Sequence, residues 1–157
     1  MTTPMSPATP IASSLLGRRQ RILITGGAGF IGGAVVRRLL RESEAIVFNL
    51  DKMGYASDLT SIDSVLTELP NGGVGRHHLQ RVDLSDGAAV AAAVREADPD
   101  LVMHLAAESH VDRSISGPGV FIESNVTGTY NLLQAVREHY ERLSGSRKDN
   151  FRLHHIS

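Results

Sequence analysis

The 157-residue sequence contains no cysteine and no tryptophan, its charges nearly cancel, and it has no long apolar run. Without cysteine the chain cannot form disulfides, a cysteine-ligated zinc site or a thiol nucleophile, which suits a reducing compartment such as the cytoplasm. A formal net charge of −1 gives no electrostatic argument for binding nucleic acid or an anionic membrane surface. No apolar run approaches the roughly 18 residues of a membrane-spanning helix. These absences predict a soluble cytoplasmic domain that binds a small molecule.

Residues 1–20 differ in composition from the rest of the chain. They contain three prolines and many serines and threonines, but no acidic residue. Such a segment can bury little apolar surface, so we expect a disordered leader over 1–20 and one folded domain over 21–157. A transit peptide is the alternative for this leader, because Arg18 and Arg19 follow an apolar stretch.

Strand and helix patterns alternate from residue 21 onward. Short apolar runs predict strands over 21–25, 45–50, 77–82, 101–105 and 151–156, and helical periodicity predicts helices over 30–40, 59–69, 86–97 and 118–142. We expect Ser85 to cap the third helix. We expect the fourth helix to bury Phe121, Ile122, Val126, Leu132, Leu133 and Val136. The alternation predicts an α/β fold, a doubly wound parallel sheet of the Rossmann type with strand order 3-2-1-4-5.

A glycine-rich turn follows the first predicted strand. Gly26, Gly29 and Gly32 have the spacing that allows a tight turn, a close approach of backbone to a diphosphate, and close packing of the next helix on the sheet. Asp51 ends the second predicted strand, where a carboxylate can accept hydrogen bonds from an adenosine ribose. That acid would repel a 2′-phosphate, so the pattern predicts NAD rather than NADP. The alternative is a glycine turn with a helix-capping aspartate.

Two further segments follow predicted strands at the same edge of the sheet. Asp83 and Leu84 can meet an adenine amino group and ring, although Asp83 alone also suits a helix cap. The segment from Leu105 to Arg113 begins with two small alanines, over which a cofactor could pass, and continues with a polar cluster. A solvated charged loop is the alternative for this segment.

The seven histidines do not form a metal-binding pattern. His77 and His78 are adjacent, as are His154 and His155, and neighbours on a strand point to opposite faces. No H-E-x-x-H motif is present, so we predict no metal site. His104 lies within an apolar run, which indicates a core histidine with its hydrogen bonds satisfied.

Taken together, TGGAGFIG, the strand-end Asp51, LAAESHVDRSI and IESNVTGTYNLLQA resemble the extended short-chain dehydrogenase/reductases. Within that superfamily of NAD-dependent epimerases and dehydratases, the chain most resembles the nucleotide-sugar 4,6-dehydratases that act on dTDP-glucose. The resemblance implies an NAD cofactor, a homodimer and a place in dTDP-rhamnose biosynthesis. It also implies an internal redox cycle, in which a hydride leaves sugar C4, water is lost across C5 and C6, and the hydride returns to C6.

The resemblance implies a set of cofactor contacts at the positions of this sequence that match the motifs. These are Gly26, Gly29, Phe30, Ile31, Gly32, Asp51, Lys52, Met53, Gly54, Asp83, Leu84, Leu105, Ala106, Ala107, Glu108, Ser109 and Ser124. Ser109 would also face the nucleotide-sugar, and Asn125 matches the helix asparagine that supports the catalytic tyrosine and lysine. The chain departs from the pattern at Gly54 and Ser124, where threonine is usual, and at Asp58, where asparagine is common.

The family's catalytic Tyr-x-x-x-Lys does not occur in the sequence. We therefore expect the NAD-binding part of a longer dehydratase, inactive and marginally stable by itself. Two alternatives stay open: an epimerase or decarboxylase of the same superfamily, and a non-catalytic NAD-binding module.

Overall fold

The computed structural model describes residues 19–109, 115 and 117–156. Most of the expected leader and part of the polar cluster, His110, Asp112 and Arg113, lie outside these residues. Gln20, which was expected in the leader, accepts a hydrogen bond from the Ile46 amide at 2.9 Å.

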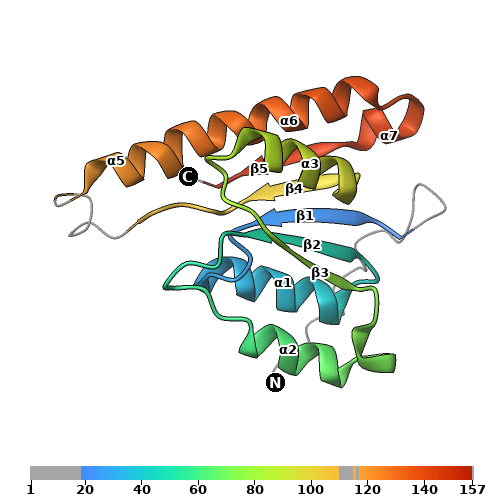
Figure 1. The fold of residues 1–157 in the computed structure, drawn as a ribbon. Helices are drawn as coiled ribbons and strands as arrows, with labels where there is room; N and C mark the ends of the chain where they lie inside the picture. The colour runs from blue at the N-terminus through green and yellow to red at the C-terminus, as the bar shows by residue number, and fades with distance from the viewer. Residues whose placement is uncertain (1–18, 110–114, 116, 157) are drawn as a thin grey trace, which may run out of the picture.

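Five parallel strands form one sheet of order β3-β2-β1-β4-β5, which confirms the predicted doubly wound α/β fold (Figure 1). The strands are β1 Arg21–Thr25, β2 Ile46–Asp51, β3 His77–Arg81, β4 Leu101–His104 and β5 Arg152–His155. The central strand β1 pairs with β2 on one side and with β4 on the other. Because all the strands are parallel, the segments that leave β1, β2, β3 and β4 emerge at the same edge of the sheet.

Helices cover both faces of the sheet (Figure 1). On one face lie α1 Phe30–Glu42 and α2 Thr60–Glu68, and on the other lie α3 Gly87–Ala97 and α6 Gly128–Arg142. A short 3-10 turn, Pro70–Gly73, precedes β3, and the short helix α7 Gly145–Asn150 precedes β5. A helix α5, Pro118–Phe121, leads into α6.

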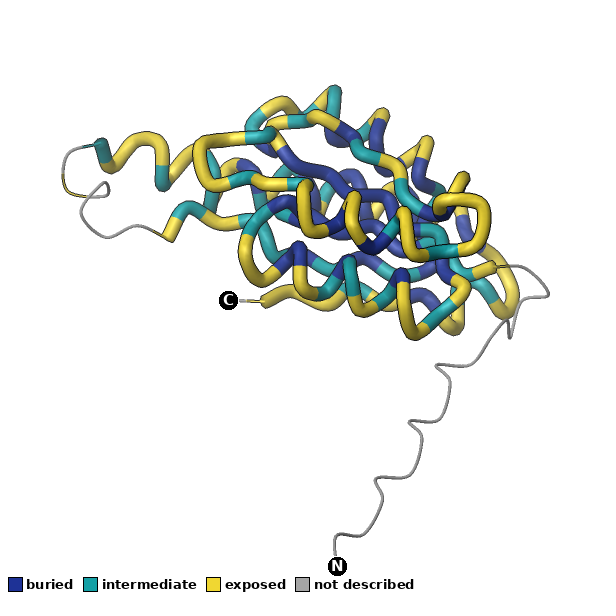
Figure 2. The backbone as a smooth tube through the Cα atoms, turned by 90° about the horizontal axis from the view of Figure 1, so that it is seen from below, coloured by how far each residue is buried: buried dark blue, intermediate teal, exposed yellow. Residues whose placement is uncertain are grey.

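Alternation of side chains along the central strand produces two apolar cores. Ile22 and Ile24 pack with Val36 and Ile62 on the side of α1 and α2. Leu23 points the other way and belongs to the core on the side of α3 and α6. Figure 2 shows this buried band along the strands, with exposed residues on the outer helix surfaces. Within the described ranges, no helix is long and apolar enough to cross a membrane.

Two expectations about helices were wrong. Asp86, not Ser85, caps α3, because the Asp86 carboxylate accepts a hydrogen bond from the Ala89 amide at 3.0 Å. In place of one regular helix over 118–142, a π-helical segment, Ile122–Thr127, separates α5 from α6.

The apolar residues expected inside the fourth helix divide into two groups. Leu132 and Val136 are buried against the sheet, whereas Ile122, Val126 and Leu133 are exposed and Phe121 is half-buried. The amino-terminal part of this helix projects past the sheet, so it has little of the domain to pack against (Figures 1 and 2). Leu133 is next to Leu132 in the sequence, so its side chain leaves the helix in another direction than Leu132 and Val136, which pack on the sheet.

Candidate functional site

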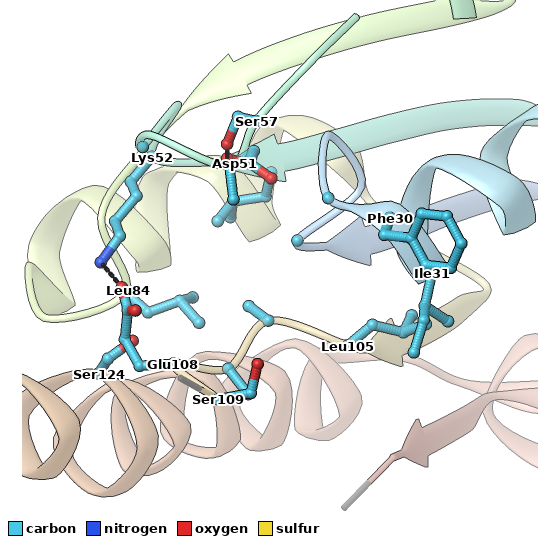
Figure 3. Close-up of a pocket in the computed structure, with 18 of the residues that line it drawn as sticks. Phe30, Ile31, Asp51, Lys52, Ser57, Leu84, Leu105, Glu108, Ser109 and Ser124 are labelled. Carbon is cyan, nitrogen blue, oxygen red and sulfur yellow. Dashed lines mark hydrogen bonds and ion pairs between the residues drawn. The ribbon is translucent and has the colours of Figure 1, made fainter. Parts of the chain in front are cut away.

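A cavity of about 620 Å³ lies at the carboxyl edge of the sheet, within the size range of small-molecule and cofactor sites (Figure 3). It lies where the connections from β1 and β4 lead to helices on opposite faces, which is where open α/β sheets bind ligands. Its described lining residues come from the ends of all five strands and from the helical segment that follows β4: Gly26, Gly29, Phe30, Ile31, Gly32, Leu50, Asp51, Lys52, Gly54, Tyr55, Ala56, Ser57, Val82, Asp83, Leu84, Leu105, Ala106, Ala107, Glu108, Ser109, Ser124 and Ile156.

The glycine turn forms one wall of the cavity. Gly26 has φ of 71°, and a Cβ there would lie 2.7 Å from the Cα of Ala106. A Cβ on Gly32 would collide with the carbonyl oxygen of Gly26. Gly26 and Gly32 are therefore required by packing of the turn against the segment after β4 and against itself. Gly29 differs, because the nearest atom to its Cβ position is the Gly26 oxygen at 3.3 Å.

Helix α1 starts in this wall with free backbone donors. Gly29 is its N-cap, no side chain of the described residues caps the helix, and its first turn contains no acidic residue. The first N–H groups of a helix have no partner within the helix, and together with the helix dipole they favour an anion. The first two residues of the helix, Phe30 and Ile31, line the cavity and are 95% and 64% exposed.

Asp51 connects the glycine turn to the turn after β2. One carboxylate oxygen, Oδ2, accepts from the Ala28 amide at 3.0 Å, and Oδ1 accepts from the Met53 amide at 2.8 Å and the Ser57 hydroxyl at 2.9 Å. A carboxylate offers about four acceptor positions, so Asp51 keeps capacity for a ligand hydroxyl. The structure shows that Asp51 also organises the protein, which its position in the sequence did not reveal.

Met53 is the one predicted contact residue that does not line the cavity, among those the structure describes. Its φ is 59°, an unusual value for a residue other than glycine, and its amide points back to Asp51. Met53 therefore shapes the turn. Sequence reasoning missed the residues that follow, Tyr55, Ala56 and Ser57, which do line the cavity.

Opposite the glycine turn, Lys52 and Glu108 form an ion pair, with Nζ and Oε1 2.8 Å apart (Figure 3). This hydrogen bond to Glu108 raises the pKa of Lys52, and the charges of Glu108, Asp83 and Asp51 add to the rise, while partial burial opposes it. The pair joins the turn after β2 to the segment after β4.

The backbone of Glu108 is held by Asn125, which lies in the π-helical segment. The Glu108 amide donates to Asn125 Oδ1 at 2.8 Å, and Asn125 Nδ2 donates to the Glu108 carbonyl at 2.9 Å. Both backbone polar groups of Glu108 are thus satisfied by one side chain. The role expected for Asn125, support of a tyrosine and lysine, stays a prediction.

Asp83 and Leu84 line the cavity at the end of β3. Asp83 does not cap α3; its carboxylate accepts from the Ser85 amide at 2.9 Å, which lowers the pKa of Asp83, with Lys52 contributing to the same effect. Asn131 donates to the Leu84 carbonyl at 2.8 Å, and a Cβ on Gly128 would lie 2.8 Å from the Leu84 Cβ. Asn131 and Gly128 therefore position Leu84, and nothing in the sequence pattern singled them out.

His104 is a core histidine, as predicted, and it supports the segment after β4. It is 2% exposed, with Nδ1 2.6 Å from the Thr25 hydroxyl and Nε2 3.0 Å from the Thr129 hydroxyl. The Ala106 amide donates to the same Thr25 oxygen at 3.2 Å. Burial lowers the pKa of His104 to about 4, and the neighbouring His155 adds to the effect. A neutral His104 can accept the Thr25 proton and donate through Nε2.

The described residues contain no group of three or more histidine, cysteine, aspartate or glutamate side chains that could hold a metal ion. The described lining residues instead bring backbone amides, carboxylates, hydroxyls and one ammonium to the cavity.

Comparison with known proteins adds information about relatives. The sequence profile described as GDP-mannose 4,6 dehydratase matches residues 23–157. The dTDP-glucose 4,6-dehydratase of Salmonella typhimurium is 47% identical over 137 residues, which are 87% of this chain and 36% of that protein. A dTDP-glucose 4,6-dehydratase from Escherichia coli is 50% identical over the same shares. The chain thus spans about a third of the length of these relatives.

Solved structures of similar fold include a dehydratase and an epimerase. DesIV, a dTDP-glucose 4,6-dehydratase from Streptomyces venezuelae with NAD and TYD bound, is 38% identical with a TM-score of 0.65, and the match covers 76% of this chain and 36% of DesIV. The UDP-glucose 4-epimerase of Thermus thermophilus in complex with NAD is 36% identical with a TM-score of 0.63, covering 76% of this chain and 34% of the epimerase.

Proposed function

Because this chain belongs to the GDP-mannose 4,6 dehydratase family, we propose that its cavity binds NAD and that it forms the NAD-binding part of a nucleotide-sugar dehydratase. The substrate we propose is dTDP-glucose, and the product is dTDP-4-keto-6-deoxyglucose, which would serve dTDP-rhamnose biosynthesis. Relatives of that activity at 47% and 50% identity support this choice.

One observation supports the cofactor assignment. The N-terminus of α1, which no described side chain caps, follows the glycine turn and lies in the same cavity as the Asp51 carboxylate at the end of β2. A diphosphate suits the free amides at the start of α1, and a ribose hydroxyl suits Asp51. Asp83 and Leu84 lie at the β3 end of the cavity, where they can meet the adenine. The described residues therefore fit a dinucleotide.

The remaining residues would orient the reactive end of the cofactor. Ala106 and Ala107 are small, so a nicotinamide ring can lie close to the backbone after β4, and Ser109 follows them to face the nucleotide-sugar. NAD, when bound, would accept and return a hydride, with water lost from the sugar in between. We assign no proton-transfer residue in this chain, because it contains no Tyr-x-x-x-Lys.

Assembly and location belong to the same proposal. Ile122, Val126, Tyr130 and Leu133 leave apolar surface exposed along the helix from α5 to α6, and we propose that this face contributes to a homodimer. The net charge of −1 and the absence of cysteine are compatible with a cytoplasmic protein that does not bind nucleic acid.

A 4-epimerase is the second candidate, because the Thermus thermophilus epimerase has a similar fold at 36% identity. Mass spectrometry of the nucleotide-sugar separates the two activities. When the protein that carries this chain is incubated with dTDP-glucose, a dehydratase yields a product lighter by one water, and an epimerase yields an isomer of unchanged mass. Binding of NAD without either product would favour a non-catalytic module. The chain by itself should give no turnover, and measurable dehydration by it would contradict that assignment.

Calorimetric titration of the chain with NAD tests the cofactor site. Asp51→Ala should weaken binding by about 1–3 kcal/mol through lost ribose hydrogen bonds. Ser57→Ala is the matched control, because it removes one protein contact of Asp51 and keeps the carboxylate. Equal affinities of wild type and Asp51→Ala would reject the ribose role. An equal loss in both variants would assign the effect to the turn.

A further inference from the structure

Four charged side chains line the cavity. Three are carboxylates, Asp51, Asp83 and Glu108, and Lys52 is the only cationic side chain among the described lining residues. The formal charge of these four side chains together is −2. Sites that take NADP usually place a cationic side chain near the ribose to meet its 2′-phosphate. Lys52, next in sequence to Asp51, is the available candidate.

Lys52 is not free to meet such a phosphate. Its ammonium is 2.8 Å from Glu108 Oε1, and the Glu108 backbone is fixed in both directions by Asn125. The Glu108 side chain is 15% exposed, so water screens the pair less than it screens ion pairs on the open surface. A ligand phosphate would have to compete with an anchored carboxylate for the one cation.

We propose that Glu108 determines cofactor selectivity, excluding NADP by engaging Lys52 and by keeping the ribose end of the cavity net negative. This proposal rests on the proposed function, because it assumes that a dinucleotide ribose lies at Asp51. It assigns to Glu108 a role beyond cofactor contact, and it explains how a lysine beside the ribose site remains compatible with NAD.

The charges predict the effect of removing the glutamate. Glu108→Gln keeps the backbone bonds to Asn125, releases Lys52, and changes the local charge from −2 to −1. A 2′-phosphate carries nearly two negative charges, so one unit of charge at a separation of a few ångströms in a solvated cavity changes its binding by about tenfold. The affinity for NAD, which lacks that phosphate, should change much less.

The experiment is calorimetric titration of the full chain with NAD and with NADP. Glu108→Gln should raise the ratio of NADP affinity to NAD affinity about tenfold, and Lys52→Met should lower it. Combining the two substitutions should remove most of the gain, because Glu108 acts through Lys52. Glu68→Gln is the control, since it breaks an ion pair with Arg41 at 3.0 Å between α1 and α2, outside the cavity.

Each outcome has a distinct meaning. An unchanged ratio in Glu108→Gln, with a wild-type melting temperature, overturns the selectivity role. A gain that persists in the double variant overturns action through Lys52. If Glu108→Gln does not fold, Lys52→Met decides by itself: an unchanged or increased ratio overturns the proposal. Failure of the wild type to bind NAD refutes the proposed function and this inference together, whereas NAD binding with unchanged selectivity refutes this inference alone.

Discussion

His104 should make the stability of the fold depend on pH in the mildly acidic range. The histidine is buried between Thr25 and Thr129, and its pKa falls from 6.5 to about 4 in the folded chain. The unfolded chain therefore binds a proton at a higher pH than the folded chain does. The contribution of neutral His104 to the free energy of unfolding is fully present above pH 6.5 and is lost as the pH falls from 6.5 toward 4.

The size of the effect follows from the two pKa values. The drop from 6.5 to about 4 corresponds to about 3 kcal/mol in the free energy of unfolding. The His104 side chain is almost fully buried, so solvent screening reduces this figure little. His155, whose ring centroid lies 4.9 Å away, acts in the same direction. A loss of this size is a large fraction of the stability of a small domain.

Urea denaturation followed by circular dichroism between about pH 4.5 and 7.5 measures this dependence. His104→Gln should reduce the slope over this range, whatever its effect on absolute stability; the remaining slope comes in part from His77 and His139, because burial lowers the pKa of each of them too. His154→Gln on β5 is the matched control, because that histidine is exposed, and it should leave the slope in place. Identical slopes for wild type and His104→Gln would refute the reasoning.

Two further substitutions test the supports of the cavity. Gly26→Ala should lower the free energy of unfolding by about 2 kcal/mol or more, because the new Cβ meets the Ala106 backbone at a positive φ. Gly72→Ala is the control, because Gly72 has φ of 63° and no atom within 4 Å of its Cβ position, so this variant measures the cost of the backbone conformation alone. An equal loss of stability in the two variants would contradict the argument that contact with Ala106 makes Gly26 necessary. Asn125→Ala should speed hydrogen exchange at the Glu108 amide by about tenfold or more, because it removes both backbone bonds of Glu108. Asn150→Ala, which loses one exposed bond, is its control, and unchanged exchange in Asn125→Ala would contradict the role in positioning.

Local pattern was enough to predict the fold. The strands of a doubly wound sheet are buried on both faces, so they appear as short apolar runs, and β1 has the bounds predicted for it. The spacing of Gly26, Gly29 and Gly32 after such a run, followed by a helical stripe, predicted the position of the cavity wall. These features depend on residues close in the sequence, and backbone sterics act at that range.

Contacts between distant segments could not be predicted in this way. Lys52 and Glu108 lie 56 positions apart, and they meet because β1 lies between β2 and β4 and brings both strand ends to one edge. The left-handed turn at Met53 and the π-helical segment that carries Asn125 have no marker such as glycine or proline at the positions concerned.

The sequence by itself determined the strand order, the glycine turn and the neighbourhood of the site, because hydrophobic period and backbone freedom are local properties. Only the tertiary structure decided how the polar groups at that site are paired. It determines which carboxylate pairs with Lys52, which backbone amides donate to Asp51, and which side chain supports the segment after β4. Pairing of charges depends on distance in space, and the packed sheet sets those distances.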